Sequence, residues 1–340
     1  MVSFVWSDVL PLYTGRGGTE TFTIGIIREL QERGIPSRVI SLGLGTDDGR
    51  EFYNDIEFVD LQSPEQLSEL DDTLVYVNFP FDVPTKKQSY VFFHYPPLDR
   101  RSRVVNYRKV LHSDTAIITN SRFMRGVWAD YLDITPNRIS IVYPFADPVY
   151  AKVKRTIRKK PVVRVLFAGR LIPDKGIYTL LEALHHNIIG EGFEFTVTAA
   201  GNQTEEGKII EKLLHHHPLV RIIKARHSPA DMARLYARYD IVAVPSNHLY
   251  WHEAFGMVSV EAQHAGCKVV ASNADGLPET NCGELILFQS GNSYDLALKI
   301  FKAAKAGPLL PEQRAESVKH FTRKSSVDLL MQILHKHGSV

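Results

Sequence analysis

Residues 164–176 read RVLFAGRLIPDKG, and the rest of the chain repeats their pattern. Arg164–Ala168 is short and apolar, which predicts a β-strand, and a helical pattern follows over Gly176–Asn187. The loop between them carries Arg170 and Lys175, two cations that can converge on one diphosphate, although the loop alone would equally fit a surface turn. A strand, a loop and a helix in this order form the unit of a parallel, doubly wound sheet.

The alternation runs through two halves of the chain. Strands are predicted in the first half at Val2–Trp6, Ser37–Leu42, Ile56–Asp60, Leu74–Asn78, Tyr90–His94, Ala116–Asn120 and Ile139–Tyr143. In the second half they are predicted at Arg164–Ala168, Glu194–Ala199, Val220–Lys224, Ile241–Pro245, Lys268–Ser272 and Glu284–Phe288. Further helix patterns lie at Thr19–Arg33, Arg122–Leu132, Ser228–Tyr239 and Met257–Ala265. The basic segment Lys152–Lys160 is expected to connect two α/β domains, residues 1–150 and 151–322.

Ligands of such sheets bind at the carboxyl ends of the strands, so two facing sheets predict a shared cleft between the domains. The segment Glu253–Glu261, which reads EAFGMVSVE, follows one of these strand ends. Its two carboxylates straddle a loop-to-helix boundary and are suited to hold sugar or ribose hydroxyls. The backbone amides of residues 255–258 would point into the cleft at the positive end of the helix. A charged helix face is the plain alternative for an isolated pair.

Two segments of the first half are candidates for the same cleft. The glycine-rich stretch 15–20, GRGGTE, follows the first strand and opens a helix, where backbone amides can approach an anion. It lacks the third glycine of the dinucleotide fingerprint, because Glu20 stands there. His94 ends an apolar strand and is well placed to touch a substrate, but such a histidine also fits a purely structural role.

Composition and charge describe an ordinary globular protein. The chain has 340 residues, a net charge of +2 and two cysteines, Cys267 and Cys282, which are expected to be small buried side chains. No apolar run reaches the length of a transmembrane helix, and the N-terminus shows no secretory signal, so a cytoplasmic location is expected. A basic stretch lies between residues 86 and 125. This stretch is expected to form a solvated face of the protein. The alternatives are that it binds an anionic acceptor or contacts the inner face of the membrane. No nucleic-acid-binding module accompanies it.

In this order and spacing, the segments resemble the retaining glycosyltransferase family 4, whose members have the GT-B fold. The likeness rests on the glycine-rich loop, the Gly169–Arg170 to Lys175–Gly176 loop, the Glu-x7-Glu segment and the turn Asp275–Glu279, which reads DGLPE. The stretch Thr119–Phe123 and the strand before Glu253 also resemble the family. The resemblance implies two Rossmann-like domains that face a central cleft. It also implies that the C-terminal helix, within residues 323–340, crosses back to the first domain.

The resemblance also implies residue roles. His94, Arg170, Lys175 and Glu253 would be catalytic, with the two cations on the donor diphosphate and Glu253 on the donor sugar. Glu261 would hold the ribose hydroxyls, and the remaining donor-binding residues would be Gly17, Gly18, Gly169, Phe255, Gly256, Met257 and Val258. Tyr13, Arg16, Asp99 and Arg100 are predicted to contact the acceptor. Ala254 and Asp275 stand where the family usually has glycine, and they are expected to reshape the donor-sugar pocket.

The implied activity is transfer of a hexose-type sugar, with retention, from a nucleotide diphosphate sugar to a hydroxyl acceptor in glycan, glycolipid or natural-product biosynthesis. A UDP-sugar is the favoured donor. No cofactor or metal is expected, since no Asp-x-Asp pair occurs in the sequence. The alternatives are a sugar-nucleotide epimerase of the same fold and a non-catalytic subunit that binds sugar nucleotides.

Overall fold

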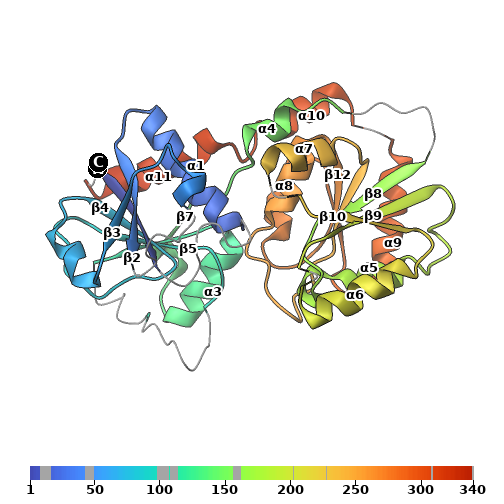
Figure 1. The fold of residues 1–340 in the computed structure, drawn as a ribbon, viewed down its shortest axis with the longest axis horizontal. Coiled ribbons are helices and arrows are strands. Elements are labelled where there is room, and N and C mark those ends of the chain that lie inside the picture. The colour runs from blue at the N-terminus through green and yellow to red at the C-terminus, as the bar shows by residue number, and fades with distance from the viewer. Residues whose placement is uncertain are drawn as a thin grey trace. The chain divides into compact units, whose positions relative to one another are not determined.

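A computed structural model describes residues 1–7, 17–42, 50–97, 107, 114–155, 162–201, 203–226, 228–307 and 309–338. The chain divides into two compact units (Figure 1). The N-terminal unit comprises Met1–Phe145 together with Arg323–Val340, and the C-terminal unit comprises Ala146–Thr322. Among the helices of the described residues, none is long and apolar enough to cross a membrane.

The N-terminal unit is built on a seven-stranded parallel sheet with the order β3-β2-β1-β4-β5-β6-β7. The strands are β1 (Val2–Ser7), β2 (Ser37–Leu42), β3 (Phe58–Leu61), β4 (Thr73–Val77), β5 (Tyr90–Phe93), β6 (Ala116–Thr119) and β7 (Ile139–Ile141). Among the described residues, the helices of this unit are α1 (Gly18–Glu32), α3 (Arg122–Leu132) and α11 (Arg323–Lys336). β4 ends one residue before its predicted limit, because Asn78 adopts a left-handed conformation with a φ of 65°.

Helix α11 completes the core of the N-terminal unit although it comes from the other end of the chain. Figure 1 shows it beside α1, and the two helices are in contact. Its Val327, Leu330 and Leu334 are buried in the cluster that lines one face of the sheet. Arg33 at the end of α1 donates to Asp328 over 2.7 Å. Burial of this apolar stripe is what holds α11 to the first unit.

The C-terminal unit has a six-stranded parallel sheet with the order β10-β9-β8-β11-β12-β13. Its strands are β8 (Val163–Phe167), β9 (Phe193–Ala199), β10 (Val220–Lys224), β11 (Ile241–Val244), β12 (Lys268–Ser272) and β13 (Leu285–Phe288). Its helices are α4 (Pro148–Lys152), α5 (Ile177–Ala183), α6 (Glu205–His215), α7 (Pro229–Tyr236), α8 (Met257–His264), α9 (Ser293–Lys305) and α10 (Pro311–Ser317).

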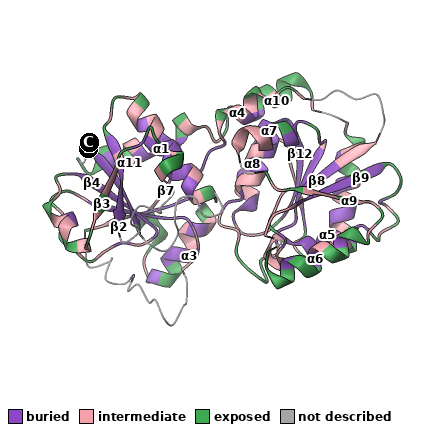
Figure 2. Ribbon diagram, in the orientation of Figure 1, coloured by how far each residue is buried: buried purple, intermediate pink, exposed green. Residues whose placement is uncertain are grey.

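The helices of this unit cover both faces of its sheet (Figure 1). Helices α5, α6 and α9 bury Leu180, Ile210 and Ile300 in one cluster with the strands. Helices α7 and α8 lie on the other face, together with α4 and α10. The central strands β11 and β12 between the two layers are buried along their whole length (Figure 2), as expected of an all-parallel sheet, whereas the edge strand β10 is only partly covered. Cys267 and Cys282 are buried free thiols, which confirms that prediction.

The connection between the units differs from the predicted one. The boundary between the two units lies after Phe145, and residues 152–155 of the expected linker belong to the C-terminal unit. Arg155 donates to the carbonyl oxygens of Gly266 and Tyr239 over 2.7 Å each. Residues 156–160 lie outside the described part of the chain. Arg155 therefore supplies hydrogen bonds to carbonyl groups that are far from it along the chain, a role that its basic neighbours in the sequence did not indicate.

Candidate donor-binding site

The loop after β8 brings Lys175 to a carboxylate on another loop. Lys175 ends a short 3₁₀ turn, Pro173–Lys175, and Gly176 follows with a φ of 71°. A side chain at position 176 would overlap the carbonyl oxygen of Pro245 at the end of β11. Glycine is required there for both reasons. The close approach of the two loops lets Lys175 Nζ lie 2.6 Å from Glu253 Oε2.

Glu253 is held by a set of polar contacts. Its carboxylate also accepts from Ser246 Oγ at 3.1 Å, and its backbone amide donates to Asp275 Oδ2 at 3.0 Å. Burial alone would raise the pKa of Glu253, but the ammonium of Lys175, the hydroxyl of Ser246 and the charge of Arg170 hold that pKa below its usual value. Glu253 is therefore ionised, and the positive charges of Lys175 and Arg170 stabilise its carboxylate.

Arg170 follows β8 on the same loop, and its exposed side chain has no ion-pair partner among the residues that the structure describes. Its backbone forms an isolated parallel bridge with Ala200, which sets the direction in which the loop leaves the sheet. Gly169 precedes it, and a Cβ there would lie 3.0 Å from the ring of Phe167. The loop thus presents one paired cation and one unpaired cation at the carboxyl end of β8.

Asp275 supports Glu253 in a way that the sequence did not indicate. Its backbone has a φ of 55°, and its carboxylate accepts from the Glu253 amide and from His252 Nδ1, the latter at 2.9 Å. The Gly276 amide in turn donates to the Glu253 carbonyl at 3.0 Å. Aspartate tolerates the left-handed region better than most side chains, which explains how it replaces a glycine here.

Helix α8 begins at Met257, after Gly256 with a φ of 97°. Phe255 is buried and packs against Phe321, so only its backbone is available to a ligand. Met257 and Val258, half-buried, begin the first turn, where N–H groups lack partners within the helix. The helix start carries the positive end of its dipole, as the sequence predicted for this segment.

Glu261 lies one turn into α8, in different surroundings from Glu253. Tyr236 of α7 donates to Glu261 Oε2 at 3.3 Å, and the hydroxyl of Tyr150 from α4 also hydrogen-bonds to this carboxylate. Burial raises the pKa of Glu261 to about 7, and the two tyrosine hydroxyls oppose that rise. Sequence reasoning missed both tyrosines, since neither is near Glu261 along the chain.

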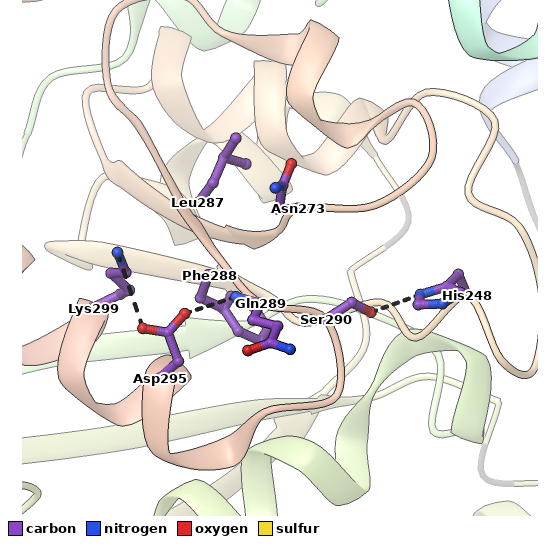
Figure 3. A pocket seen from close by; sticks show the side chains of 8 residues that line it. All are labelled: His248, Asn273, Leu287, Phe288, Gln289, Ser290, Asp295 and Lys299. Carbon is purple, nitrogen blue, oxygen red and sulfur yellow. Dashed lines mark hydrogen bonds and ion pairs between the residues drawn. The ribbon is translucent and has the colours of Figure 1, made fainter.

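A pocket of about 410 Å³ lies beside the loops that carry Glu253 and Asp275. It is lined by His248, Asn273, Leu287, Phe288, Gln289, Ser290, Asp295 and Lys299. Figure 3 shows Asn273 and Leu287 on one side of it and Gln289 and Asp295 on the other. Asp295 accepts from the backbone amide of Gln289 at 2.7 Å, and the His248 ring contacts the Ser290 hydroxyl at 3.0 Å. The volume is sufficient for a small ligand.

The N-terminal unit holds the other predicted site residues. His94 is 8% exposed, with its ring stacked on Phe92 at 4.4 Å. Burial lowers the pKa of His94 to about 3, so its imidazole is neutral at physiological pH. Among the described residues no side chain or backbone group hydrogen-bonds to its ring, whereas its backbone is fixed by Asn78 and Asn120. A neutral imidazole of this kind can donate to or accept from an uncharged ligand.

Gly17 and Gly18 stand at the start of α1, where Gly17 is the N-cap residue. Glu20 lies in the first turn, 4% exposed, and its carboxylate accepts from the backbone of Gly17 and of Glu20 itself. Burial raises the pKa of Glu20 to about 7. The residue that breaks the dinucleotide fingerprint thus caps the helix. Tyr13, Arg16, Asp99 and Arg100 lie outside the described residues.

The C-terminal unit therefore brings Arg170, Lys175 and Glu253 together at the carboxyl ends of β8 and β11. These two strands are neighbours at the switch point of the sheet, where doubly wound folds bind ligands. Glu261 belongs to a separate cluster with the two tyrosines, and His94, Gly17 and Gly18 belong to the other unit.

Comparison with solved structures shows which fold the two units form. A glycosyltransferase from Rickettsia africae superposes with a TM-score of 0.78 at 18% identity, over 98% of this chain and 97% of that one. Anabaena HepE in complex with UDP and glucose superposes with a TM-score of 0.68 at 19% identity, over 98% and 99% of the two chains. WaaG, a glycosyltransferase involved in lipopolysaccharide biosynthesis, superposes with a TM-score of 0.65 at 18% identity, over all of both chains. The protein thus has the GT-B fold, as predicted.

Residues 151–321 match the family described as glycosyl transferases group 1, and the chain belongs to that family. A D-inositol 3-phosphate glycosyltransferase from Corynebacterium kroppenstedtii is 29% identical over 197 residues, which are 53% of this chain and 43% of that protein. A lipopolysaccharide 1,2-N-acetylglucosaminetransferase from Salmonella typhimurium is 28% identical over 202 residues, 53% of this chain and 52% of that protein. The chain spans about half the length of the curated relatives it matches.

Proposed function

We propose that this protein is a retaining, metal-independent hexosyltransferase that takes its sugar from a nucleotide diphosphate donor, with a UDP-sugar favoured. The observation that supports this most directly is the ion pair between Lys175 and Glu253 at the switch point of the C-terminal sheet, with the cation Arg170, unpaired among the described residues, on the same loop as Lys175. Two cations suit a diphosphate, and a carboxylate beside them suits the hydroxyls of the attached sugar.

In this proposal, Arg170 and Lys175 bind the diphosphate and offset the negative charge that develops as the nucleoside diphosphate leaves. Glu253 accepts from hydroxyls of the donor sugar, and Asp275 holds its backbone in place. The amides at the start of α8 add further donors to phosphate or sugar oxygens. Glu261 accepts from the ribose hydroxyls. The contact of His94 with the donor sugar stays a prediction.

The proposed step is a front-face substitution. The bond between the anomeric carbon and the phosphate oxygen breaks, and a bond to the acceptor oxygen forms on the same face of the sugar. The hydroxyl proton of the acceptor passes to an oxygen of the leaving phosphate. The acceptor is a hydroxyl compound from glycan, glycolipid or natural-product biosynthesis. The two cations take the electrostatic role that a divalent metal has in other transferases.

A thermal-shift panel tests the donor site. UDP, GDP, ADP, dTDP and their glucose conjugates are added to the wild type, with and without EDTA, and to Arg170→Ala. One nucleotide at about 100 times its Kd should stabilise the protein by about 2.7 kcal/mol, with no effect of EDTA. Arg164→Ala is the matched control, since Arg164 lies at the opposite end of β8, where it pairs with Glu194.

Loss of the shift in Arg170→Ala but not in Arg164→Ala supports the proposed diphosphate contact. A shift that needs a divalent metal, or none with any nucleotide, contradicts the proposal as stated. Retention is tested separately by NMR: the slow hydrolysis of the selected α-linked sugar nucleotide should release the α-anomer first. Initial release of the β-anomer would contradict the front-face step.

A further inference from the structure

The second carboxylate of the Glu-x7-Glu segment, Glu261, lies in a cluster formed by three helices. Tyr236 from α7 is fully buried and Tyr150 from α4 is 3% exposed, and both hydroxyls hydrogen-bond to the Glu261 carboxylate on α8. The two tyrosine rings have centroids 5.9 Å apart. Figure 1 shows α4, α7 and α8 packed on the same side of the sheet, so the cluster is internal to the C-terminal unit.

Both tyrosines are fixed by contacts that do not involve Glu261. Asp147 caps α4 by accepting from the Val149 amide at 2.8 Å. Arg314 donates to the carbonyl oxygens of Tyr150, Ala151 and Val153 at 3.3, 3.0 and 2.7 Å. The Tyr236 carbonyl lies 3.2 Å from Cys267 Sγ. These contacts fix the backbone of both tyrosines, and burial restricts their side chains, so little side-chain entropy is lost in making the hydrogen bonds to Glu261.

The chemistry of the carboxylate explains what two such donors do. A carboxylate in an apolar setting takes up a proton, and the protonated form has an O–H group in place of an acceptor site. Burial raises the pKa of Glu261, Asp147 adds to the rise, and the two phenol groups counteract both. Each phenol uses one of about four acceptor positions on the carboxylate, which leaves positions for the hydroxyls of a ligand.

We propose that Tyr150 and Tyr236 are positioning residues whose hydroxyls orient the Glu261 carboxylate toward the two ribose hydroxyls of the donor. This inference rests on the proposed function, because it takes the nucleoside diphosphate as the ligand. It deepens that function by assigning the discrimination between ribose and deoxyribose to two hydroxyl groups outside the Glu-x7-Glu segment.

Isothermal titration calorimetry tests this by measuring the Kd of UDP and of 2′-deoxy-UDP. The proteins compared are the wild type, Tyr150→Phe, Tyr236→Phe, the double variant and Glu261→Gln. Each Tyr→Phe change removes one hydroxyl group and should weaken UDP binding by about 2- to 10-fold, the worth of one hydrogen bond. Binding of 2′-deoxy-UDP should weaken less, so the preference for UDP falls in the double variant. In a Glu261→Gln background the same changes should have little effect.

A pH series separates positioning from a structural role. Loss of the phenol donors raises the pKa of Glu261, so the pH below which UDP binding weakens should move upward in the double variant. Tyr239→Phe is the matched control, since Tyr239 is also buried and follows α7 closely. It should leave the Kd values and the pH profile unchanged. Circular dichroism and Tm verify that each variant is folded.

The inference is overturned if the Tyr→Phe changes weaken UDP and 2′-deoxy-UDP binding equally, or if the double variant prefers UDP as strongly as the wild type does. In either case, UDP binding by the wild type leaves the proposed function standing. A wild type that binds neither nucleotide overturns both. A lower Tm with unchanged nucleotide preference and pH profile assigns the tyrosines a structural role only and also overturns the inference.

Discussion

Removal of the Lys175 ammonium should lower the free energy of unfolding of the ligand-free protein, and the exposure of its ion pair sets limits on the size of this loss. Lys175 Nζ and Glu253 Oε2 are 2.6 Å apart, and their side chains are 24% and 18% exposed. Exposed ion pairs contribute about 0–1 kcal/mol, whereas removing one partner of a buried pair costs about 3–5 kcal/mol. This pair lies between the two limits, so Lys175→Met should cost about 2 kcal/mol. For a domain of 150–250 residues this lowers Tm by about 4–8 °C.

The sign of the pH dependence follows from Glu253. Its pKa in the folded protein is held below the ordinary value of 4.5, so its stabilising contribution is present above that value. The contribution is lost as pH falls through the lowered pKa. In Lys175→Met, burial dominates and the carboxyl is left without its main partner. The difference between variant and wild type should therefore be largest at neutral pH and shrink as the pH falls toward about 4, where Glu253 becomes protonated in the variant and in the unfolded chain.

Urea unfolding at pH 4 and 7 measures the effect for Lys175→Met, Glu253→Gln and the double variant. The double variant should lose about 1–2 kcal/mol less than the sum of the single losses, since it leaves no uncompensated charge. Lys299→Met is the matched control, because its ammonium lies 4.0 Å from Asp295 at similar exposure and contributes little. Additive single losses, or an equal loss in Lys299→Met, would refute the assigned strength of the Lys175–Glu253 pair.

Two further expectations concern the N-terminal unit. Leu330→Ala should cost about 2–5 kcal/mol in urea unfolding because Leu330 is 1% exposed in the core, and the exposed neighbour Gln332→Ala should change stability by less than about 0.5 kcal/mol. Equal losses would show that α11 is not held by burial. The folded-state pKa of Glu20 is raised to about 7, so it adds stability below about pH 4.5 that is lost as pH rises through 7. Glu20→Gln should therefore gain up to about 3 kcal/mol relative to the wild type between pH 4 and pH 8, and a constant difference would contradict this.

Local pattern was sufficient to predict most strands and the longer helices. β2, β10, β12 and α3 have the predicted bounds, since their apolar periodicity and flanking turn residues lie within a few positions. The observed boundaries of an element differ from the predicted ones where the conformation of a single residue ends or begins that element. Helix α5 begins at Ile177 and not at Gly176, because Gly176 is left-handed and lies against Pro245. That contact joins residues that are far apart in the chain.

The candidate site divides in the same way. The positions of Arg170, Lys175, Glu253 and Glu261 at strand ends or a helix start could be read from hydrophobic pattern and glycine placement, and the family resemblance supplied their roles. Their partners were decided by the tertiary structure. Asp275 contacts Glu253, Tyr150 and Tyr236 contact Glu261, and α11 packs on α1, only because sheet order brings distant segments together. Pairing between side chains depends on topology and packing, which no short stretch of sequence specifies.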